Sequence, residues 1–326
     1  MQSFQTARIE PPTTVSGSAI VLQRFNPGQI RQEKRMQFNT VLSLEHFDNP
    51  SLRTLTREIF THSVAADPAF PRSNRCAKVW ENALCVRGLR EFGAIHEEAE
   101  ILGIGAGEEI TSFYLTRHVR RVFATDIYAD AKVWAETANR DMLASPETSV
   151  PVGYPWNPKR LVVQHMDALS LRYEDNSFDG IFSSGSIEHF GTLDDITLAA
   201  QEMGRVLKPR GILTLATEFR IEGPADGVGI PGAVIFSPEM LLKTIVHPSG
   251  LELVDEPHFV TTPATRRLAY PLLEALSKRI RDPSVALEHD GYIWTSVVLC
   301  LRKPAAGAIR AARSTLTEAL RRLRYR

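Results

Sequence analysis

Three glycines at alternate positions follow an apolar run in "AEILGIGAGEEITSFYLTRHVRRVFATDIY", residues 99–128. Gly103, Gly105 and Gly107 would let the backbone at a strand-to-helix turn approach a ligand closely, and the amide groups at the start of the helix attract polar atoms. Asp126 ends the next apolar run, and a carboxylate at that place can accept both hydroxyls of a ribose. The stretch therefore predicts a site for a ligand that contains a nucleoside.

The glycine spacing separates two classes of cofactor. Dinucleotide sites use G-x-G-x-x-G, whereas here the third glycine comes early and Glu108 would place a negative charge near a pyrophosphate. Asp167, in "HMDAL" at the end of a later apolar run, is suited to reach an adenine ring. A ribose, an adenine and a phosphate-free tail describe S-adenosylmethionine better than NAD. An Asp after a strand is also a common turn residue, which is the alternative for both carboxylates.

His189 and Glu188, in "SSGSIEHFGTLDD", are the candidates for catalysis. An unperturbed imidazole titrates near pH ~6.5 and can accept the proton of an alcohol. Glu188 is the weaker candidate for the same work, and a histidine bonded to the backbone at a helix start is the structural alternative. Asp194 and Asp195 point apart on a helix start, so we expect no metal.

Further acids are weaker candidates for the acceptor side. Glu218 ends an apolar run, and the segment "EHDGY", residues 288–292, precedes the last one. Acids in loops more often cap turns.

The elements that position these residues are strands alternating with helices. Apolar segments predict strands at 100–105, 121–126, 161–166, 178–184, 211–219, 251–259 and 294–303. Amphipathic segments separate most of them, among them "DDITLAAQEMGRVLK" and "SPEMLLKTIV", the latter with Ser237 as its predicted N-cap. This alternation predicts an α/β fold with an open, doubly wound parallel sheet that is covered on both faces.

Before the first of these strands the sequence predicts a helix and a segment with little periodicity. The segment "SNRCAKVWENALCVRGLREFG" predicts a helix with Ser73 or Asn74 as N-cap, Gly93 at its end and Trp80 in the core. Residues 1–47 show little periodicity apart from a candidate strand at "SAIVLQRF", and we expect them to drape over the domain or to be partly disordered.

Composition indicates an ordinary globular protein of 326 residues, 43% hydrophobic and 23% charged. Its longest apolar runs are well short of the ~18 residues that span a bilayer, and "MQSFQTARIEPP" does not read as a signal peptide. Cys76, Cys85 and Cys300 form no disulfide framework. We therefore expect a cytoplasmic protein.

The charge is uneven along the chain. Residues 302–326 carry eight basic side chains against one acid, Glu318, so the rest of the chain is net acidic and we expect no nucleic-acid partner. The tail "GAIRAARSTLTEALRRLRYR" predicts a basic amphipathic helix. Such a helix can lie on an anionic membrane, associate with a second copy or dock on the body.

Four blocks, "ILGIGAGEE", "FATD", "MDALSLRYEDNSFDGIFSSGSIEHF" and "EMGRVLKPRGILTLATEF", occur in the order and spacing of a known family. The chain resembles class I S-adenosylmethionine-dependent methyltransferases of the type 11 small-molecule group over about residues 75–302. The resemblance implies a Rossmann-like seven-stranded sheet whose last strand is antiparallel, S-adenosylmethionine as cofactor and S-adenosylhomocysteine as product. It assigns Gly103, Gly105 and Gly107 to the methionine end, Asp126 and Ile127 to the ribose, Met166, Asp167 and Ala168 to the adenine, and Ser184 and Gly185 to the border of sulfonium and acceptor.

We accordingly predict three parts: an N-terminal extension and helical cap (1–72), a methyltransferase domain (73–303) and a basic tail (304–326). The insert at 260–291 carries Arg266, Arg267 and Arg281. It is either a lid that binds an anionic acceptor, or a segment that packs on the sheet or forms a dimer interface.

The predicted reaction is methyl transfer to a small-molecule acceptor, at oxygen. The group also contains enzymes encoded with cell-surface polysaccharide genes, so a sugar or glycolipid hydroxyl is one candidate by analogy. The alternatives are a non-catalytic binding protein of the same fold and, disfavoured by Glu108, an NAD-dependent oxidoreductase.

Overall fold

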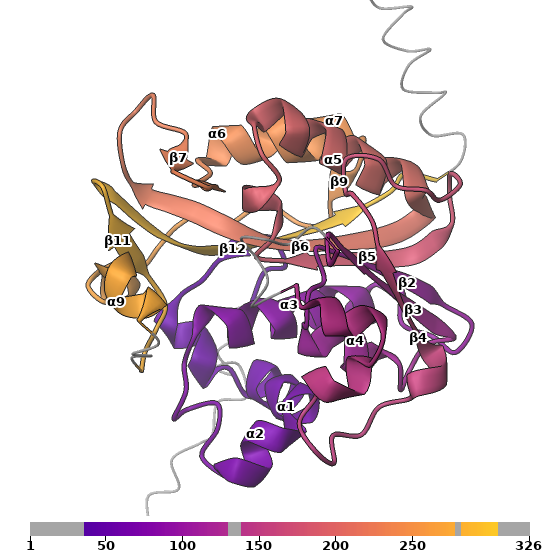
Figure 1. Cartoon of the computed structure of the whole chain (residues 1–326). Helices are drawn as coiled ribbons and strands as arrows, with labels where there is room; N and C mark the ends of the chain where they lie inside the picture. Colours follow the sequence, from indigo (N-terminus) through magenta and orange to yellow (C-terminus); the bar gives the residue numbers. More distant parts are fainter. Residues whose placement is uncertain (1–35, 130–137, 278–281, 306–326) are drawn as a thin grey trace, which may run out of the picture. The chain divides into compact units, whose positions relative to one another are not determined.

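A computed structural model describes residues 36–129, 138–277 and 282–305 of the chain. These residues fall in one compact unit. A mixed sheet runs through its centre and helices cover both faces (Figure 1). The predicted α/β class is confirmed.

The strands are β1 (Thr40–Val41), β2 (Glu100–Ile104), β3 (Arg121–Asp126), β4 (Leu161–His165), β5 (Phe178–Ser184), β6 (Leu207–Glu222), β7 (Gly229–Ile230), β8 (Ala233–Val234), β9 (Glu252–Leu253), β10 (Tyr270–Pro271), β11 (Leu287–His289) and β12 (Tyr292–Arg302). The α-helices are α1 (Pro50–Ile59), α2 (Thr61–Ala66), α3 (Ala77–Glu91), α4 (Ile110–Leu115), α5 (Leu193–Val206), α6 (Pro238–Leu241), α7 (His247–Ser249), α8 (Pro263–Arg266) and α9 (Leu272–Leu276). A π-helical turn, η6 (Leu242–Val246), joins α6 to α7, and short 3-10 turns are η1 (Leu44–Asp48), η2 (Arg140–Leu143), η3 (Pro146–Ser149), η4 (Pro158–Arg160) and η5 (Ile187–His189).

The sheet follows the predicted doubly wound plan. Its parallel part has the order β4-β3-β2-β5-β6, and β12 joins β6 antiparallel. The short β9 pairs with β12 and completes seven strands, so the antiparallel last strand is confirmed. Strands β1, β10 and β11 extend the sheet beyond this plan. Because the order reverses between β2 and β5, the loops after these two strands meet at the edge where open α/β sheets bind ligands.

The helices form one layer on each face of the sheet. On one side α3 packs against β5, β6 and β12 and is backed by α1 and α4. On the other, α5 packs against β6, η6 and α7. Trp80 on α3 is fully buried, as predicted for a core residue. Central strands such as β5 are buried along almost their whole length, which is typical of parallel strands covered on both faces.

Several predicted boundaries are wrong, among them those of the strand expected at 211–219, because β6 spans Leu207–Glu222. The strand expected at 251–259 ends at Leu253, because the Asp255 carboxylate turns away to accept the backbone N–H groups of Phe38 and Asn39 at 2.7 and 3.1 Å. Helix α3 begins at Ala77 with Cys76 as N-cap, not Ser73 or Asn74.

The insert explains the late start of α3. Arg75 forms an ion pair with Asp282, and the Ala77 N–H donates to the Ser284 carbonyl at 2.9 Å, so the residues before the helix are extended. The other two helix ends are confirmed. Gly93 has a φ of 78°, and the Ser237 hydroxyl accepts the N–H of Met240.

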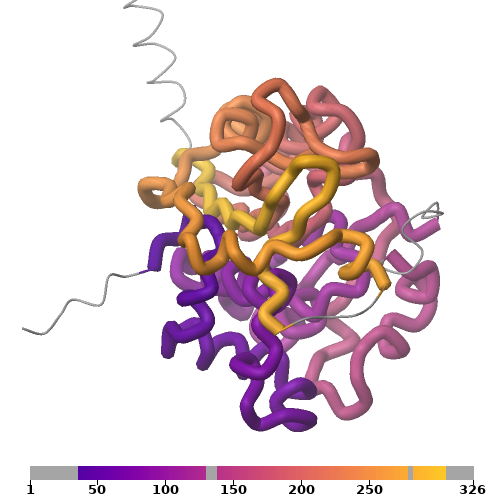
Figure 2. Tube along the Cα trace, turned by 90° about the vertical axis from the view of Figure 1, so that its left-hand side faces the viewer, coloured from indigo at the N-terminus to yellow at the C-terminus, as the bar shows by residue number. Residues whose placement is uncertain are grey.

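Segments distant in sequence lie side by side (Figure 2). Residues 36–47 do not drape over the domain, because β1 pairs with β12 and Phe38 and Leu42 are buried in the core. The insert lies alongside this region and adds β10 and β11 to the sheet. The strand predicted at "SAIVLQRF", Arg281 and the tail from residue 306 lie outside the described residues.

No helix in the described ranges combines the length and apolar character needed to cross a bilayer. The three cysteines are free thiols.

Candidate functional site

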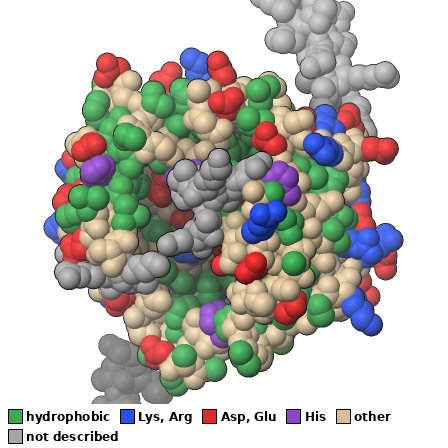
Figure 3. Space-filling view, viewed as in Figure 1, with side chains coloured by type: hydrophobic (Ala, Val, Ile, Leu, Met, Phe, Trp, Pro, Cys, Tyr) green, Lys and Arg blue, Asp and Glu red, His purple; other side chains and the backbone are tan. Residues whose placement is uncertain are grey.

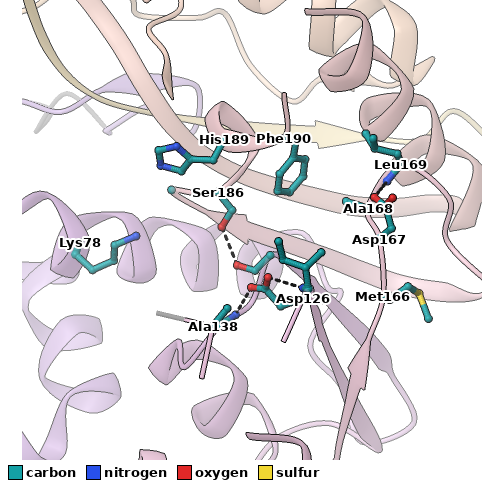
Figure 4. A pocket seen from close by; sticks show the side chains of 14 residues that line it. Lys78, Asp126, Ala138, Met166, Asp167, Ala168, Leu169, Ser186, His189 and Phe190 are labelled. Atoms are coloured by element: carbon teal, nitrogen blue, oxygen red, sulfur yellow. Dashed lines mark hydrogen bonds between the residues drawn. The ribbon is translucent and has the colours of Figure 1, made fainter. Parts of the chain in front are cut away.

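A cavity of about 520 Å³ opens where the loops after β2, β3, β4 and β5 meet. Its volume is in the range of about 300 to 1,000 Å³ that small-molecule sites occupy. Figure 3 shows a hollow on this face of the molecule, with hydrophobic side chains on its walls. The cavity is lined by Lys78, Gly105, Gly107, Asp126, Ile127, Ala138, Met166, Asp167, Ala168, Leu169, Gly185, Ser186, His189 and Phe190 (Figure 4).

The glycine loop after β2 forms one wall. Gly105 and Gly107 have φ values of 60° and 42°, a region that strains other residues. A Cβ on Gly105 would lie 2.5 Å from the Ser186 Cβ, so a side chain there would also displace the loop after β5. Side-chain hydroxyls hold the alternate carbonyls of this loop: Thr125 donates to Gly103 at 2.8 Å, Ser186 to Gly105 at 2.7 Å and Tyr128 to Gly107 at 2.8 Å.

Asp126 lies at the end of β3, between the two ends of the cavity. Its carboxylate accepts the N–H of Gly107 at 2.8 Å and the N–H of Ile127 at 2.7 Å. Burial raises the pKa of Asp126, and these two hydrogen bonds oppose the rise. A carboxylate offers about four lone-pair positions, so two remain for a ligand with two hydroxyls.

Residues after β4 form one end of the cavity. The Met166 N–H donates to the backbone carbonyl of Asp126 at 2.9 Å, which ties this loop to the end of β3. Asp167 is exposed and accepts the N–H of Leu169 at 2.9 Å. Asp167 therefore shapes a turn, as the structural alternative predicts, and also borders the cavity.

Lys78 of α3 reaches the opposite end (Figure 4). Its ammonium lies 3.1 Å from Glu81 and 3.2 Å from Glu109, and donates to the Ser184 carbonyl at 3.1 Å. Burial alone would lower the pKa of Lys78, but the carboxylates of Glu109 and Glu81 outweigh it and raise the pKa well above its ordinary value. Half of the side-chain surface is still exposed. A fixed positive charge therefore stands at this end of the cavity.

His189, at the end of η5, borders the same end. Its Nδ1–H donates to the Gly232 carbonyl at 2.7 Å, which leaves the lone pair of the neutral ring on Nε2. Nε2 lies 3.9 Å from the Glu188 carboxylate. Glu188 is 2% exposed and accepts the Thr217 hydroxyl at 2.8 Å. Burial raises the pKa of Glu188, although His189 opposes the rise.

Residues 102–215 match the family model of a methyltransferase domain. This range contains the glycine loop, Asp126 and the loop that carries His189. Residues 102–215 therefore form a methyltransferase domain. Its cofactor is S-adenosylmethionine, and the cavity, the glycine loop without side chains and the Asp126 carboxylate fit such a ligand.

Several solved structures are similar to this chain. One is a putative sarcosine dimethylglycine methyltransferase from Galdieria sulphuraria, with 19% identity and a TM-score of 0.47 over 68% of this chain and 85% of that one. A putative methyltransferase from Bacillus halodurans has 18% identity and a TM-score of 0.44 over 68% and 99%. The 1,6-didemethyltoxoflavin-N1-methyltransferase of Burkholderia thailandensis, solved with 1,6-didemethyltoxoflavin and S-adenosylhomocysteine, has 17% identity and a TM-score of 0.42 over 78% and 91%.

The methyltransferase cavity brings most of the predicted site residues together. Those that line it are Gly105, Gly107, Asp126, Ile127, Met166, Asp167, Ala168, Gly185 and His189. Gly103, Ser184 and Glu188 lie behind its wall. Gly103 is needed for packing, because a Cβ there would come within 2.5 Å of the Phe182 ring. The Ser184 hydroxyl donates to Glu81 at 3.3 Å.

Sequence reasoning missed several residues of the methyltransferase site, and Lys78 is the most consequential. A lysine in an amphipathic helix is usually solvent-exposed, and only the tertiary fold brings Lys78 to Gly185. Ser186 lies in the motif "SSGSIEHFGTLDD", but nothing about a single serine there indicates that it contacts the cofactor loop. The segment 288–292 forms the turn between β11 and β12 and does not line the cavity. The described residues hold no cluster of three or more metal-ligating side chains.

Proposed function

We propose that this enzyme transfers the methyl group of S-adenosylmethionine to a hydroxyl oxygen of a small-molecule acceptor. The orientation of His189 carries the proposal. Because Nδ1–H is committed to the Gly232 carbonyl, the neutral imidazole presents a basic Nε2 at the end of the cavity. An alcohol must lose a proton during methyl transfer, whereas an amine with a lone pair needs no such help.

The cofactor placement that we propose follows from the two ends of the cavity. Asp126 accepts the ribose hydroxyls, and the adenine lies against Met166, Asp167 and Ala168. The methionine part then extends along Gly105 and Gly107 toward Lys78. There the Lys78 ammonium binds the carboxylate of the methionine part. Glu109, which lies 3.2 Å from Lys78, binds the ammonium group of the methionine part.

The protein contributes alignment and one proton acceptor. S-adenosylmethionine supplies an activated methyl group, and the cavity walls orient it toward the acceptor. His189 takes the hydroxyl proton at Nε2, and the Glu188 carboxylate 3.9 Å away stabilises the imidazolium that results. Thr217 holds Glu188 in place through its hydrogen bond of 2.8 Å. Glu188 is thus a positioning residue in this scheme and His189 the catalytic one.

The acceptor class and the partners are also proposals. A sugar or glycolipid hydroxyl is the acceptor class that the sequence resemblance favours. We propose no nucleic-acid partner, because the chain before residue 302 is net acidic. Peripheral membrane contact or self-association through the basic tail remains a proposal for residues outside the described ranges, as does a lid role for the insert.

Methyl-labelled S-adenosylmethionine and a panel of sugars, glycosides and phenols, each beside its matched amino analogue, test the reaction. We expect label on hydroxyl compounds and a turnover at least about 10²-fold lower in His189→Gln. Label on amines alone, with equal turnover in wild type and variant, would contradict the proposal. Cofactor binding without transfer to any compound would instead favour a binding protein.

A further inference from the structure

Buried acids gather behind the cavity wall that carries Gly185. A Cβ placed on Gly185 would lie 2.6 Å from the Lys78 ammonium, 3.3 Å from a Glu81 oxygen and 3.6 Å from a Glu188 oxygen, so one cation and two carboxylates stand next to this residue. Glu81 and Glu188 are 4% and 2% exposed. Gly185 itself lines the cavity. The wall at this end is therefore backed by two carboxylates that water hardly reaches.

Glu218 adds a third acid from the neighbouring strand. It pairs with Ser296 across β6 and β12, and the Ser296 hydroxyl donates to Glu81 at 2.5 Å. The pKa of Glu218 is raised well above its ordinary value by burial and by the charges of Glu188 and Glu81, although Lys78 opposes the rise. The three carboxyl groups thus repel one another through space.

Within the described part of the chain, the cations around these acids do not balance them. Lys78 is shared between Glu81 and Glu109, so its single charge faces two carboxylates before Glu188 and Glu218 are counted. His189 is the other basic side chain that acts on Glu188. Crowded, buried carboxylates cost folding free energy, and a permanent positive charge in the cavity would offset that cost.

The cofactor carries such a charge and the product does not. The sulfonium of S-adenosylmethionine connects the ribose to the methionine chain. With the ribose at Asp126 and the methionine carboxylate at Lys78, it lies on the path along Gly105 and Gly185, a placement that rests on the proposed function. S-adenosylhomocysteine has the same groups but a neutral sulfur, so its sulfur gains no charge attraction from Glu81, Glu188 and Glu218.

We propose that Glu188 and Glu218 make the cavity discriminate by charge, so that it binds the sulfonium of S-adenosylmethionine in preference to the neutral sulfur of S-adenosylhomocysteine. The two ligands differ by one methyl group and one charge, so the ratio of their affinities isolates the effect of the acids. A loss of cavity shape would weaken both ligands alike and leave the ratio unchanged.

Calorimetric titration of the full chain with each ligand at pH 8 tests this inference. The variants are Glu188→Gln and Glu218→Gln. Glu222→Gln is the matched control, because Glu222 lies outside the cavity and forms an ion pair with Arg266. We expect the affinity ratio of S-adenosylmethionine to S-adenosylhomocysteine to fall about tenfold in the first two variants, and to keep its wild-type value in the control.

The outcomes separate this inference from the function on which it rests. A wild-type ratio in both Glu188→Gln and Glu218→Gln would overturn the charge discrimination while leaving cofactor binding intact. Failure of the wild type to bind either ligand would overturn the cofactor assignment and this inference together. Should Glu188→Gln fail to fold, Glu218→Gln decides, because Glu218 is less deeply buried than Glu188.

Discussion

The Nδ1 atom of His189 lies 2.7 Å from the carbonyl oxygen of Gly232, so a turn between two short strands fixes the proton on one nitrogen of the ring. Gly232 sits between β7 and β8, far from the cofactor loops in sequence. A carbonyl only accepts hydrogen bonds, and the basic nitrogen must therefore be Nε2. The β7–β8 hairpin thus helps to define the chemistry of a residue that follows β5.

Replacing His189 should separate binding from turnover. His189→Gln keeps a side chain that can donate to Gly232 but loses the basic nitrogen. We expect affinity for S-adenosylmethionine to stay within about threefold of wild type, while turnover with a hydroxyl acceptor falls at least about 10²-fold. Titration and a labelled-methyl assay measure the two effects. Equal turnover in both proteins would remove His189 from the mechanism.

Asp126 should dominate cofactor affinity. Asp126→Ala removes both proposed ribose contacts and leaves the Gly107 and Ile127 N–H groups without their acceptor. We expect affinity for S-adenosylmethionine and S-adenosylhomocysteine to fall about a hundredfold, or ~2.7 kcal/mol. Asp167→Ala is the comparison at the adenine end of the cavity, where we expect a smaller loss because the exposed carboxylate mainly caps a turn. A larger loss in Asp167→Ala than in Asp126→Ala would reverse this assignment.

A pair of glycines tests the need for space in the cofactor loop. Gly93 and Gly105 both have positive φ, 78° and 60°, but a Cβ meets nothing within 4 Å at Gly93 and lies 2.5 Å from Ser186 at Gly105. Gly93→Ala should lower the free energy of unfolding by about 1 kcal/mol from backbone strain alone and leave cofactor binding intact.

Gly105→Ala should lower cofactor affinity as well as stability. The added methyl group collides with Ser186 and breaks the hydrogen bond from Ser186 to the Gly105 carbonyl. We expect cofactor affinity to fall at least about tenfold beyond the strain that the two variants share. Chemical unfolding and titration of both variants give the comparison. Similar cofactor affinities in the two would show that the loop tolerates a side chain at Gly105.

His46 should make stability depend on pH. It accepts hydrogen bonds from the Trp80 indole N–H and the Ser43 backbone N–H, and burial lowers its pKa from 6.5 to about 4. Because the folded-state pKa lies below the unfolded value, this contribution is complete above pH 6.5 and is lost as the pH falls toward 4. The loss amounts to at most roughly 3 kcal/mol.

Urea unfolding of wild type and His46→Phe between pH 7.5 and 4.5 measures this effect. The variant should be less stable at pH 7.5, since the Trp80 N–H loses its acceptor, but its stability should fall less steeply with acid. Parallel curves for the two proteins would show that His46 does not carry the pH dependence.

Local sequence predicted the strands of the parallel sheet well, because buried parallel strands are short apolar runs that end in glycine or aspartate. Residues 121–126 and 178–184 match β3 and β5 along their whole length. The strand at 251–259 failed because Asp255 bonds to residues that lie more than 200 positions away. The predicted N-cap of α3 was wrong for the same kind of reason, since the residues at the start of α3 pair with the insert.

The site divides in a similar way. Loop residues that follow strands, such as Gly105, Asp126 and His189, are recognisable because their types and spacing suit the chemistry. Lys78 and Glu81 come from a helix whose pattern carries no such signal. Their place beside the cavity depends on how α3 crosses β5, which is a tertiary property that spacing along the chain does not encode.

The outer edge of β12 is shared by three strands, since β1, β9 and β11 each pair with a different stretch of it. During synthesis, β1 can join the central sheet only after residues 292–302 of β12 have left the ribosome. Ser296, which fixes Glu81 behind the cofactor cavity, arrives at the same time. The acidic wall of the cavity is therefore expected to assemble in the last step of folding, so that a nascent chain acquires its cofactor only when nearly the whole domain has emerged.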